Sequence, residues 1–157
     1  MLNGDARACL EVHHAAVRGI AAKDYPTEVV EDWAPMPVTE KSIERFLINS
    51  DGELRLVAEI DGRIVGVGAL VLANCEFRAC YVAPEAARGG VGSALVREIE
   101  RIAQDNGLAY LQVDSSVTAE AFYATHGYYV RQRSEYTLPS GRRMACVKMQ
   151  KALKRHC

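Results

Sequence analysis

The chain has 157 residues, of which 49% are hydrophobic and 25% are charged, with a formal net charge of -1. This length and composition predict one domain, residues 1–157, with a full two-layer core, and the lack of basicity argues against a nucleic-acid partner. The apolar runs fall far short of the roughly 20 residues that span a bilayer, and the N-terminus lacks the basic and apolar regions of a signal peptide. We therefore expect a cytoplasmic protein without a membrane partner.

The cysteines and histidines show no metal-binding or redox pattern. The five cysteines are odd in number and form no C-x-x-C pair. His13 and His14 are adjacent and cannot share a helix face, while His126 and His156 are isolated. The sequence therefore predicts no metal site, and small buried or terminal thiols at Cys9, Cys75, Cys80, Cys146 and Cys157.

Three helices are predicted in the first third of the chain. Apolar residues recur at helical spacing over residues 5–22, and a Tyr-Pro pair ends this helix. A short helix over residues 28–33 follows, and Thr39 is the predicted N-cap of a third helix that ends at Ile48. The short helix has an acidic face that is either solvated or attracts a cationic ligand, formed by Glu28, Glu31 and Asp32.

The middle of the chain changes to an alternating pattern that predicts strands. Residues 53–60 and 63–72 are joined by Asp61-Gly62, a strong hairpin signal, and a turn then leads to a third strand over residues 75–82. These strands should form an antiparallel meander. Strict alternation in the third strand would place Phe77 and Tyr81 on one face and Cys80 and Val82 on the other.

Helical periodicity returns over residues 91–106, and Gly107 follows as the expected C-terminal glycine. A short apolar strand over residues 109–113 should pair in parallel with the strand before this helix. A further helix over residues 118–126 is capped by Ser116 or Thr118 and stopped by Gly127. Residues 128–136 and 142–149 then predict a closing hairpin.

The glycine-rich stretch over residues 88–93 lies between a predicted strand and a predicted helix. Such a turn directs several backbone N–H groups toward one point at the positive end of the helix, which is a common way of binding phosphate. No lysine follows the glycines, which excludes a P-loop. A dinucleotide fingerprint fits poorly, because Leu95 stands in place of the third glycine and the preceding meander leaves too little chain for a doubly wound sheet.

Two motifs together resemble the GNAT superfamily of N-acetyltransferases. The family signature Gln/Arg-x-x-Gly-x-Gly/Ala corresponds to the glycine-rich stretch after Tyr-Val-Ala-Pro, and a second signature is Ala119-x-x-Phe122-Tyr123-x-x-x-Gly127-Tyr128. The resemblance covers nearly the whole chain. It implies an α/β fold with a mixed, mainly antiparallel central sheet, helices on both faces, and a first strand that is short or missing, because only residues 1–4 precede the first helix.

The resemblance also implies a function, which is transfer of the acetyl group of acetyl-CoA to a primary amine of a small molecule or peptide. The amine attacks directly in a ternary complex without a metal, and Tyr123 is the general acid that protonates the departing CoA thiolate. A backbone N–H near Val82 would polarise the thioester carbonyl. The implied cofactor-binding residues are Tyr81, Val82, Arg88, Gly89, Gly90, Val91, Gly92, Ser93 and Thr118.

Several points remain open within this interpretation. Ala87 stands where the motif has Gln or Arg, so phosphate binding depends on the backbone N–H groups that follow. Glu76 is a candidate general base, although a water chain would serve equally well. A CoA-binding regulatory domain without turnover is the alternative function. Exposed strand edges would allow a homodimer.

Overall fold

A computed structural model describes residues 2–154, so His156 and Cys157 lie outside the described residues. A six-stranded sheet has the order β1-β2-β3-β4-β6-β5, and only the β3–β4 pair is parallel. This confirms the mixed, mainly antiparallel sheet. The strands are β1 Leu54–Ile60, β2 Arg63–Val71, β3 Glu76–Val82, β4 Tyr110–Ser116, β5 Tyr129–Thr137 and β6 Arg143–Ala152.

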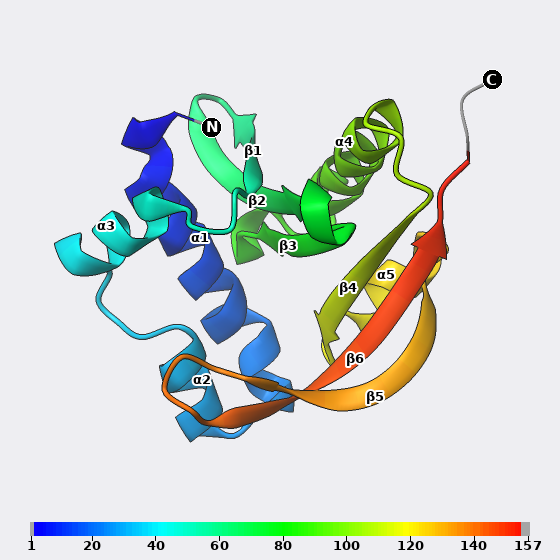
Figure 1. The fold of residues 1–157 in the computed structure, drawn as a ribbon. Helices are drawn as coiled ribbons and strands as arrows, with labels where there is room; N and C mark the ends of the chain where they lie inside the picture. Colours follow the sequence, from blue (N-terminus) through cyan, green and yellow to red (C-terminus); the bar gives the residue numbers. More distant parts are fainter. Residues whose placement is uncertain (1, 155–157) are drawn as a thin grey trace.

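Helices cover both faces of this sheet, as expected (Figure 1). Val67 of β2 packs with α1, whereas Leu70 of the same strand packs with α4. The α-helices are α1 Ala6–Gly19, α2 Thr27–Trp33, α3 Glu40–Ile48, α4 Val91–Asp105 and α5 Glu120–Thr125. The 3₁₀ helices are η1 Asn3–Asp5, η2 Ala21–Asp24, η3 Leu72–Asn74 and η4 Pro84–Ala86. In the described residues before α1 there is no strand, which agrees with a first strand that is short or missing.

Local sequence signals set several of the boundaries. Thr39 caps α3, because its hydroxyl accepts a hydrogen bond from the Ser42 N–H at 3.1 Å. Asp61 and Gly62 both have positive φ angles, 52° and 78°, which is the geometry that a two-residue hairpin turn requires. Gly107 follows α4 with φ 78° and is the predicted C-terminal glycine.

A β-bulge changes which side chains of β3 face α4. Ala69 pairs with Ala79 and Leu70 pairs with Phe77, so Arg78 has no partner in register. The extra residue turns Phe77 toward the core beneath α4, where Cys80 also packs, while Tyr81 faces α1. The prediction that Phe77 and Tyr81 share a face was therefore wrong, because strict alternation does not hold across a bulge.

The two central strands separate soon after they meet. β3 and β4 have one registered pair, Glu76 with Gln112, whereas β4 pairs with β6 along its whole length. Figure 1 shows that β3 and β4 run in diverging directions. The diverging ends leave the backbone edge of β3 near Tyr81 and Val82 without a strand neighbour on the β4 side.

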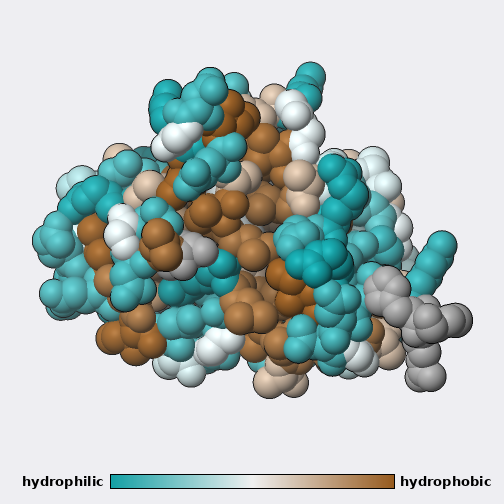
Figure 2. Space-filling view, turned by 90° about the horizontal axis from the view of Figure 1, so that it is seen from above, coloured by the Kyte–Doolittle hydropathy of each residue, from teal (hydrophilic) through white to brown (hydrophobic). Residues whose placement is uncertain are grey.

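The surface differs in polarity from place to place. In the view from above, apolar residues gather across the middle of the face, with hydrophilic residues on either side of them (Figure 2). Over residues 2–154, no helix has both the length and the hydropathy needed to cross a bilayer.

Candidate functional site

A cavity of about 560 Å³ opens where β3 and β4 diverge. Three groups of residues form its wall. The first comes from β3, from the end of β4 and from α5 with the loop before it, and consists of Cys80, Tyr81, Val82, Ser116, Thr118, Ala119 and Phe122. The second belongs to the glycine-rich turn and consists of Ala87, Arg88, Gly90, Gly92 and Ser93. The third, which we call the α1–α2 wall, consists of Ala16, Val17, Ile20, Ala21 and Trp33.

The glycine-rich turn borders this cavity through Gly90, Gly92 and Ser93, and it leaves backbone N–H groups free at the start of α4. Gly90 is the N-cap of α4 with φ 85°, and the first intrahelical bond runs from the Ala94 N–H to the Gly90 carbonyl oxygen at 3.0 Å. The amides of residues 91–93 precede that bond, and no acceptor in the part of the chain that the structure describes occupies them. Arg88 also has a positive φ, 65°, which is uncommon for a residue other than glycine. The turn is thus shaped to present donors to an anion.

Side chains beneath the turn fix its position. A Cβ atom on Gly92 would lie 3.0 Å from Cζ of Phe122, which is tighter than an ordinary van der Waals contact, so any side chain here would have to displace the Phe122 ring. Val91 is 8% exposed and packs into the core beside Leu95, and Gly89 is exposed. Of the predicted cofactor-binding residues, Gly89 and Val91 therefore do not form part of the cavity wall, and the others do.

Tyr123 lies behind the wall of the cavity. Its side chain is 4% exposed, and its ring packs edge-on against Phe77, Phe122 and Tyr128 at centroid distances of 5.5, 5.4 and 5.7 Å. Phe122, and not Tyr123, contributes to the cavity surface. Burial raises the pKa of Tyr123 well above 10, with smaller contributions from Cys80 and Tyr81, so its hydroxyl is protonated at neutral pH.

Cys80 also lines the cavity, although the sequence predicted only a small buried thiol there. Burial raises its pKa to about 12. At neutral pH it is therefore a thiol and not a thiolate, which keeps it a poor nucleophile.

Thr118 and a buried tyrosine join the cavity wall to the first helices. The Thr118 hydroxyl donates a hydrogen bond to the Asp24 carboxylate at 2.7 Å. The Tyr25 hydroxyl donates to the Ala145 carbonyl at 2.6 Å and accepts from the Val117 N–H at 2.8 Å. Sequence reasoning did not single out Tyr25 or the individual residues of the α1–α2 wall, because helical periodicity shows that a helix face is buried but not which of its side chains border a cavity.

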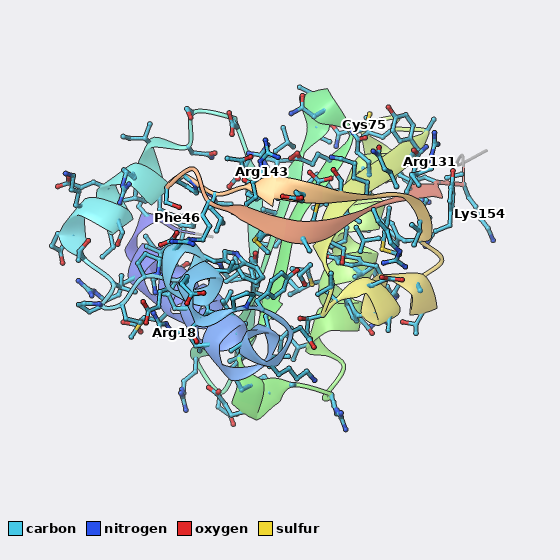
Figure 3. All side chains as sticks on the ribbon, turned by 90° about the horizontal axis from the view of Figure 1, so that it is seen from below. Arg18, Phe46, Cys75, Arg131, Arg143 and Lys154 are labelled. Atoms are coloured by element: carbon cyan, nitrogen blue, oxygen red, sulfur yellow. The ribbon has the colours of Figure 1, made fainter. Side chains whose placement is uncertain are left out.

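The candidate base Glu76 is remote from the cavity. It begins β3, four residues before Cys80, so at about 3.3 Å per residue it lies roughly 13 Å away along the strand. Its carboxylate accepts a 2.6 Å hydrogen bond from Nε of Arg78. Figure 3 labels Cys75, the residue before Glu76, and Arg18, which follows the wall residues Ala16 and Val17 in α1. The two labelled residues lie far apart in that view. Glu76 is not part of the cavity wall.

The acidic face of α2 does not reach the cavity either. The Asp32 carboxylate accepts hydrogen bonds from the Ser140 hydroxyl at 2.9 Å and from Nε of Arg142 at 2.7 Å, which attaches α2 to the β5–β6 turn. Glu28 and Glu31 are exposed and do not line the cavity. Within residues 2–154, no group of three or more His, Cys, Asp or Glu side chains is placed to hold a metal ion.

Comparisons with known proteins agree on one family. Residues 21–153 match a family model described as an acetyltransferase (GNAT) domain. A structure described as a GCN5-related N-acetyltransferase, aminotransferase class-II, from Rhodopseudomonas palustris has 30% identity and a TM-score of 0.87, covering 98% of this chain and 92% of that one. No curated protein sequence matches.

Two more distant structures share the fold. The PaiA N-acetyltransferase of Thermoplasma acidophilum, solved in complex with coenzyme A, has 21% identity and a TM-score of 0.72, covering 97% of this chain and 95% of that one. A ribosomal-protein-alanine N-acetyltransferase from Brucella melitensis has 23% identity and a TM-score of 0.71, covering 98% and 97%.

Proposed function

This chain belongs to the GNAT acetyltransferase family, whose members use acetyl-CoA, and we propose that it acetylates a primary amine of a small molecule or peptide. One observation carries the proposal. A single cavity joins the free N–H groups at the start of α4 to the unpaired backbone edge of β3. A phosphate group and an extended amide chain can therefore be bound side by side.

The residues present fit acetyl-CoA. The N–H groups of Val91, Gly92 and Ser93 would bind its diphosphate, with the Arg88 guanidinium in support. The backbone of Tyr81 and Val82 would pair with the pantetheine amides as an added strand does. Thr118, which lines the cavity, would contact the same cofactor arm.

The reaction replaces a carbon–sulfur bond with a carbon–nitrogen bond. A backbone N–H near Val82 would stabilise the negative charge that develops on the thioester oxygen as the neutral amine attacks. The attacking amine loses one proton to solvent water, the leaving thiolate gains one from the Tyr123 hydroxyl, and the resulting Tyr123 phenolate takes a proton back from solvent, so the protons balance over one turnover. Because burial raises the pKa of Tyr123 well above 10, its proton is held more tightly than a free tyrosine would hold it. Tyr123 would act by donating a hydrogen bond that becomes a proton transfer as the thiolate forms.

The buried position of Tyr123 also favours a second candidate, a CoA-binding regulatory domain without turnover. A thiol-release assay separates the two. The protein is mixed with acetyl-CoA and a panel of amines, and free CoA thiol is measured over time. Amine-dependent thiol release supports the transferase, whereas saturable CoA binding without release on any amine supports the regulator.

We further propose that residues 1–157 act as one domain in the cytoplasm. The cavity wall draws on residues from Ala16 to Phe122, which supports one folding unit. The sheet ends in β1 on one side and β5 on the other, and either edge could pair with a second copy to form a homodimer. Light scattering after size-exclusion chromatography tests the homodimer, because a monomeric mass would contradict it.

A further inference from the structure

We infer that the acceptor amine is carried on an apolar skeleton, aliphatic or aromatic, without a second positive charge, and that Trp33 selects it. The inference rests on the proposed acetyl transfer, because it names the acceptor class for the same cavity. It replaces the expectation of a cationic acceptor, whose basis was the acidic face of α2.

The α1–α2 wall consists of apolar side chains. Ala16, Val17, Ile20 and Ala21 come from α1 and from the 3₁₀ turn after it, and Trp33 ends α2. These side chains offer an acceptor dispersion contacts and removal from water, and no charged partner.

Trp33 occupies a defined position in this wall. Its ring packs edge-on against Tyr25 at 5.6 Å and against Tyr81 at 6.5 Å. Tyr25 is itself held by its two backbone hydrogen bonds, which fixes one of the aromatic neighbours of Trp33. Tyr81 precedes Val82, where the proposed mechanism places the thioester. Trp33 is therefore close to the point where an attacking amine must be held.

The charges around the cavity disfavour a second ammonium group. No carboxylate forms part of the wall within the described residues; Asp32 is ion-paired with Arg142, and Asp24, which accepts a hydrogen bond from the neutral Thr118 hydroxyl, lies outside the wall. Moving an ammonium group from water into such a site without an anion is costly.

The same lack of charge helps the reacting amine. An amine attacks only when it is neutral, and removal from water lowers the pKa of an ammonium group. An apolar wall beside the thioester would therefore favour the reactive form without a dedicated base. This explains chemically why Glu76 can lie outside the site.

Two probe amines test the inference. 2-Phenylethylamine has one amine on an aromatic skeleton, and spermidine has several cationic groups. We expect kcat/KM for 2-phenylethylamine to exceed that for spermidine by roughly tenfold or more. An aromatic side chain can also bind a cation, so spermidine is a fair competitor. Equal or higher kcat/KM for spermidine would overturn the inference.

Variants assign the selection to Trp33. Trp33→Ala should lower kcat/KM for 2-phenylethylamine by roughly tenfold, mainly through KM, and Trp33→Phe should keep most of it. Both variants should bind CoA with unchanged Kd, which also shows that they fold. The control Glu28→Gln/Glu31→Gln changes only exposed side chains of α2 and should leave both amines unaffected. An unchanged KM in Trp33→Ala would contradict the assignment.

Binding can also be measured without turnover, because Trp33 is the only tryptophan of the chain. With CoA bound, 2-phenylethylamine should change the tryptophan fluorescence in a saturable way at concentrations where spermidine does not. Saturable binding without thiol release would support the inference and refute acetyl transfer. Thiol release that favours spermidine would support acetyl transfer and refute the inference about the acceptor. If neither binding nor thiol release were seen, both acetyl transfer and the inference would be refuted.

Discussion

The hydroxyl group of Ser93, in the first turn of α4, lies 3.1 Å from Nε2 of His126, which ends α5. The His126 ring also packs against Phe122 at a centroid distance of 4.9 Å, and Phe122 contacts Gly92. Phe122 of α5 and His126, the C-cap residue of the same helix, therefore support the turn that we propose binds the diphosphate. Burial lowers the pKa of His126, so its ring is neutral at pH 7.

Loss of this contact should weaken acetyl-CoA binding. A net hydrogen bond contributes about 0.5–1.5 kcal/mol, so His126→Ala should raise the Kd for acetyl-CoA by roughly 2- to 10-fold. Isothermal titration calorimetry measures this. If His126 acts through Ser93, the double variant Ser93→Ala/His126→Ala should bind no more weakly than Ser93→Ala alone. Additive losses would show that the two residues act independently.

Gly92 provides a second test of the phosphate site. In Gly92→Val the side chain would meet the Phe122 ring and displace the start of α4, which should weaken acetyl-CoA binding by roughly 100-fold. Gly4→Val is the matched control, because no atom lies within 4 Å of a Cβ at that position. Intact acetyl-CoA binding by a folded Gly92→Val protein would refute the proposed phosphate site.

Much of this fold could be predicted from local sequence signals. Asp61-Gly62 specifies its hairpin because both residues tolerate positive φ, and the Thr39 cap depends on neighbours in the chain. The glycine-rich turn was predictable for the same reason. Such features need only a few adjacent residues.

Features that depend on contacts distant in the sequence could not be predicted. The bulge at Arg78 is a property of the β2–β3 pairing, and it reverses the face of Phe77. The burial of Tyr123 results from Phe77 and Tyr128, which reach it from different strands and loops. Trp33 meets Tyr81 only once α2 has folded over the sheet, so an isolated aromatic residue gave no signal of a cavity wall.

The proposed general acid makes a prediction about rate. Tyr123→Phe removes only the hydroxyl group and should lower kcat by roughly 10²- to 10⁴-fold, while the Kd for acetyl-CoA stays the same. Because burial places the pKa of Tyr123 well above 10, the wild-type rate should show no loss from its deprotonation below pH 10. Stopped-flow thiol release and calorimetry measure the two constants. An unchanged kcat would remove Tyr123 from the mechanism.

Stability should fall in acid because of His13, a half-buried histidine in α1 whose ring lies against other aromatic side chains. Burial, followed by the charge of His14, lowers the pKa of His13 from 6.5 to about 3, and its ring packs against Tyr81 at 4.5 Å. The folded state therefore favours neutral His13, whereas the unfolded chain binds a proton below pH 6.5. The contribution of neutral His13 to the free energy of unfolding is fully present above pH 6.5. It is lost as the pH falls from 6.5 toward 3, at up to about 1.4 kcal/mol per pH unit.

Replacing His13 with a residue that does not titrate should reduce this acid sensitivity. His13→Phe keeps an aromatic ring against Tyr81, so its free energy of unfolding should fall less steeply than that of the wild type between pH 6.5 and 4. Urea unfolding at several pH values measures the slopes. His14 also has a lowered pKa, from burial and then from Arg18, so His14→Phe is the matched comparison. If the free energy of unfolding fell with the same slope in His13→Phe and the wild type, His13 would take up its proton equally readily in the folded and unfolded chains. Its ring would then have to be hydrated beside Tyr81.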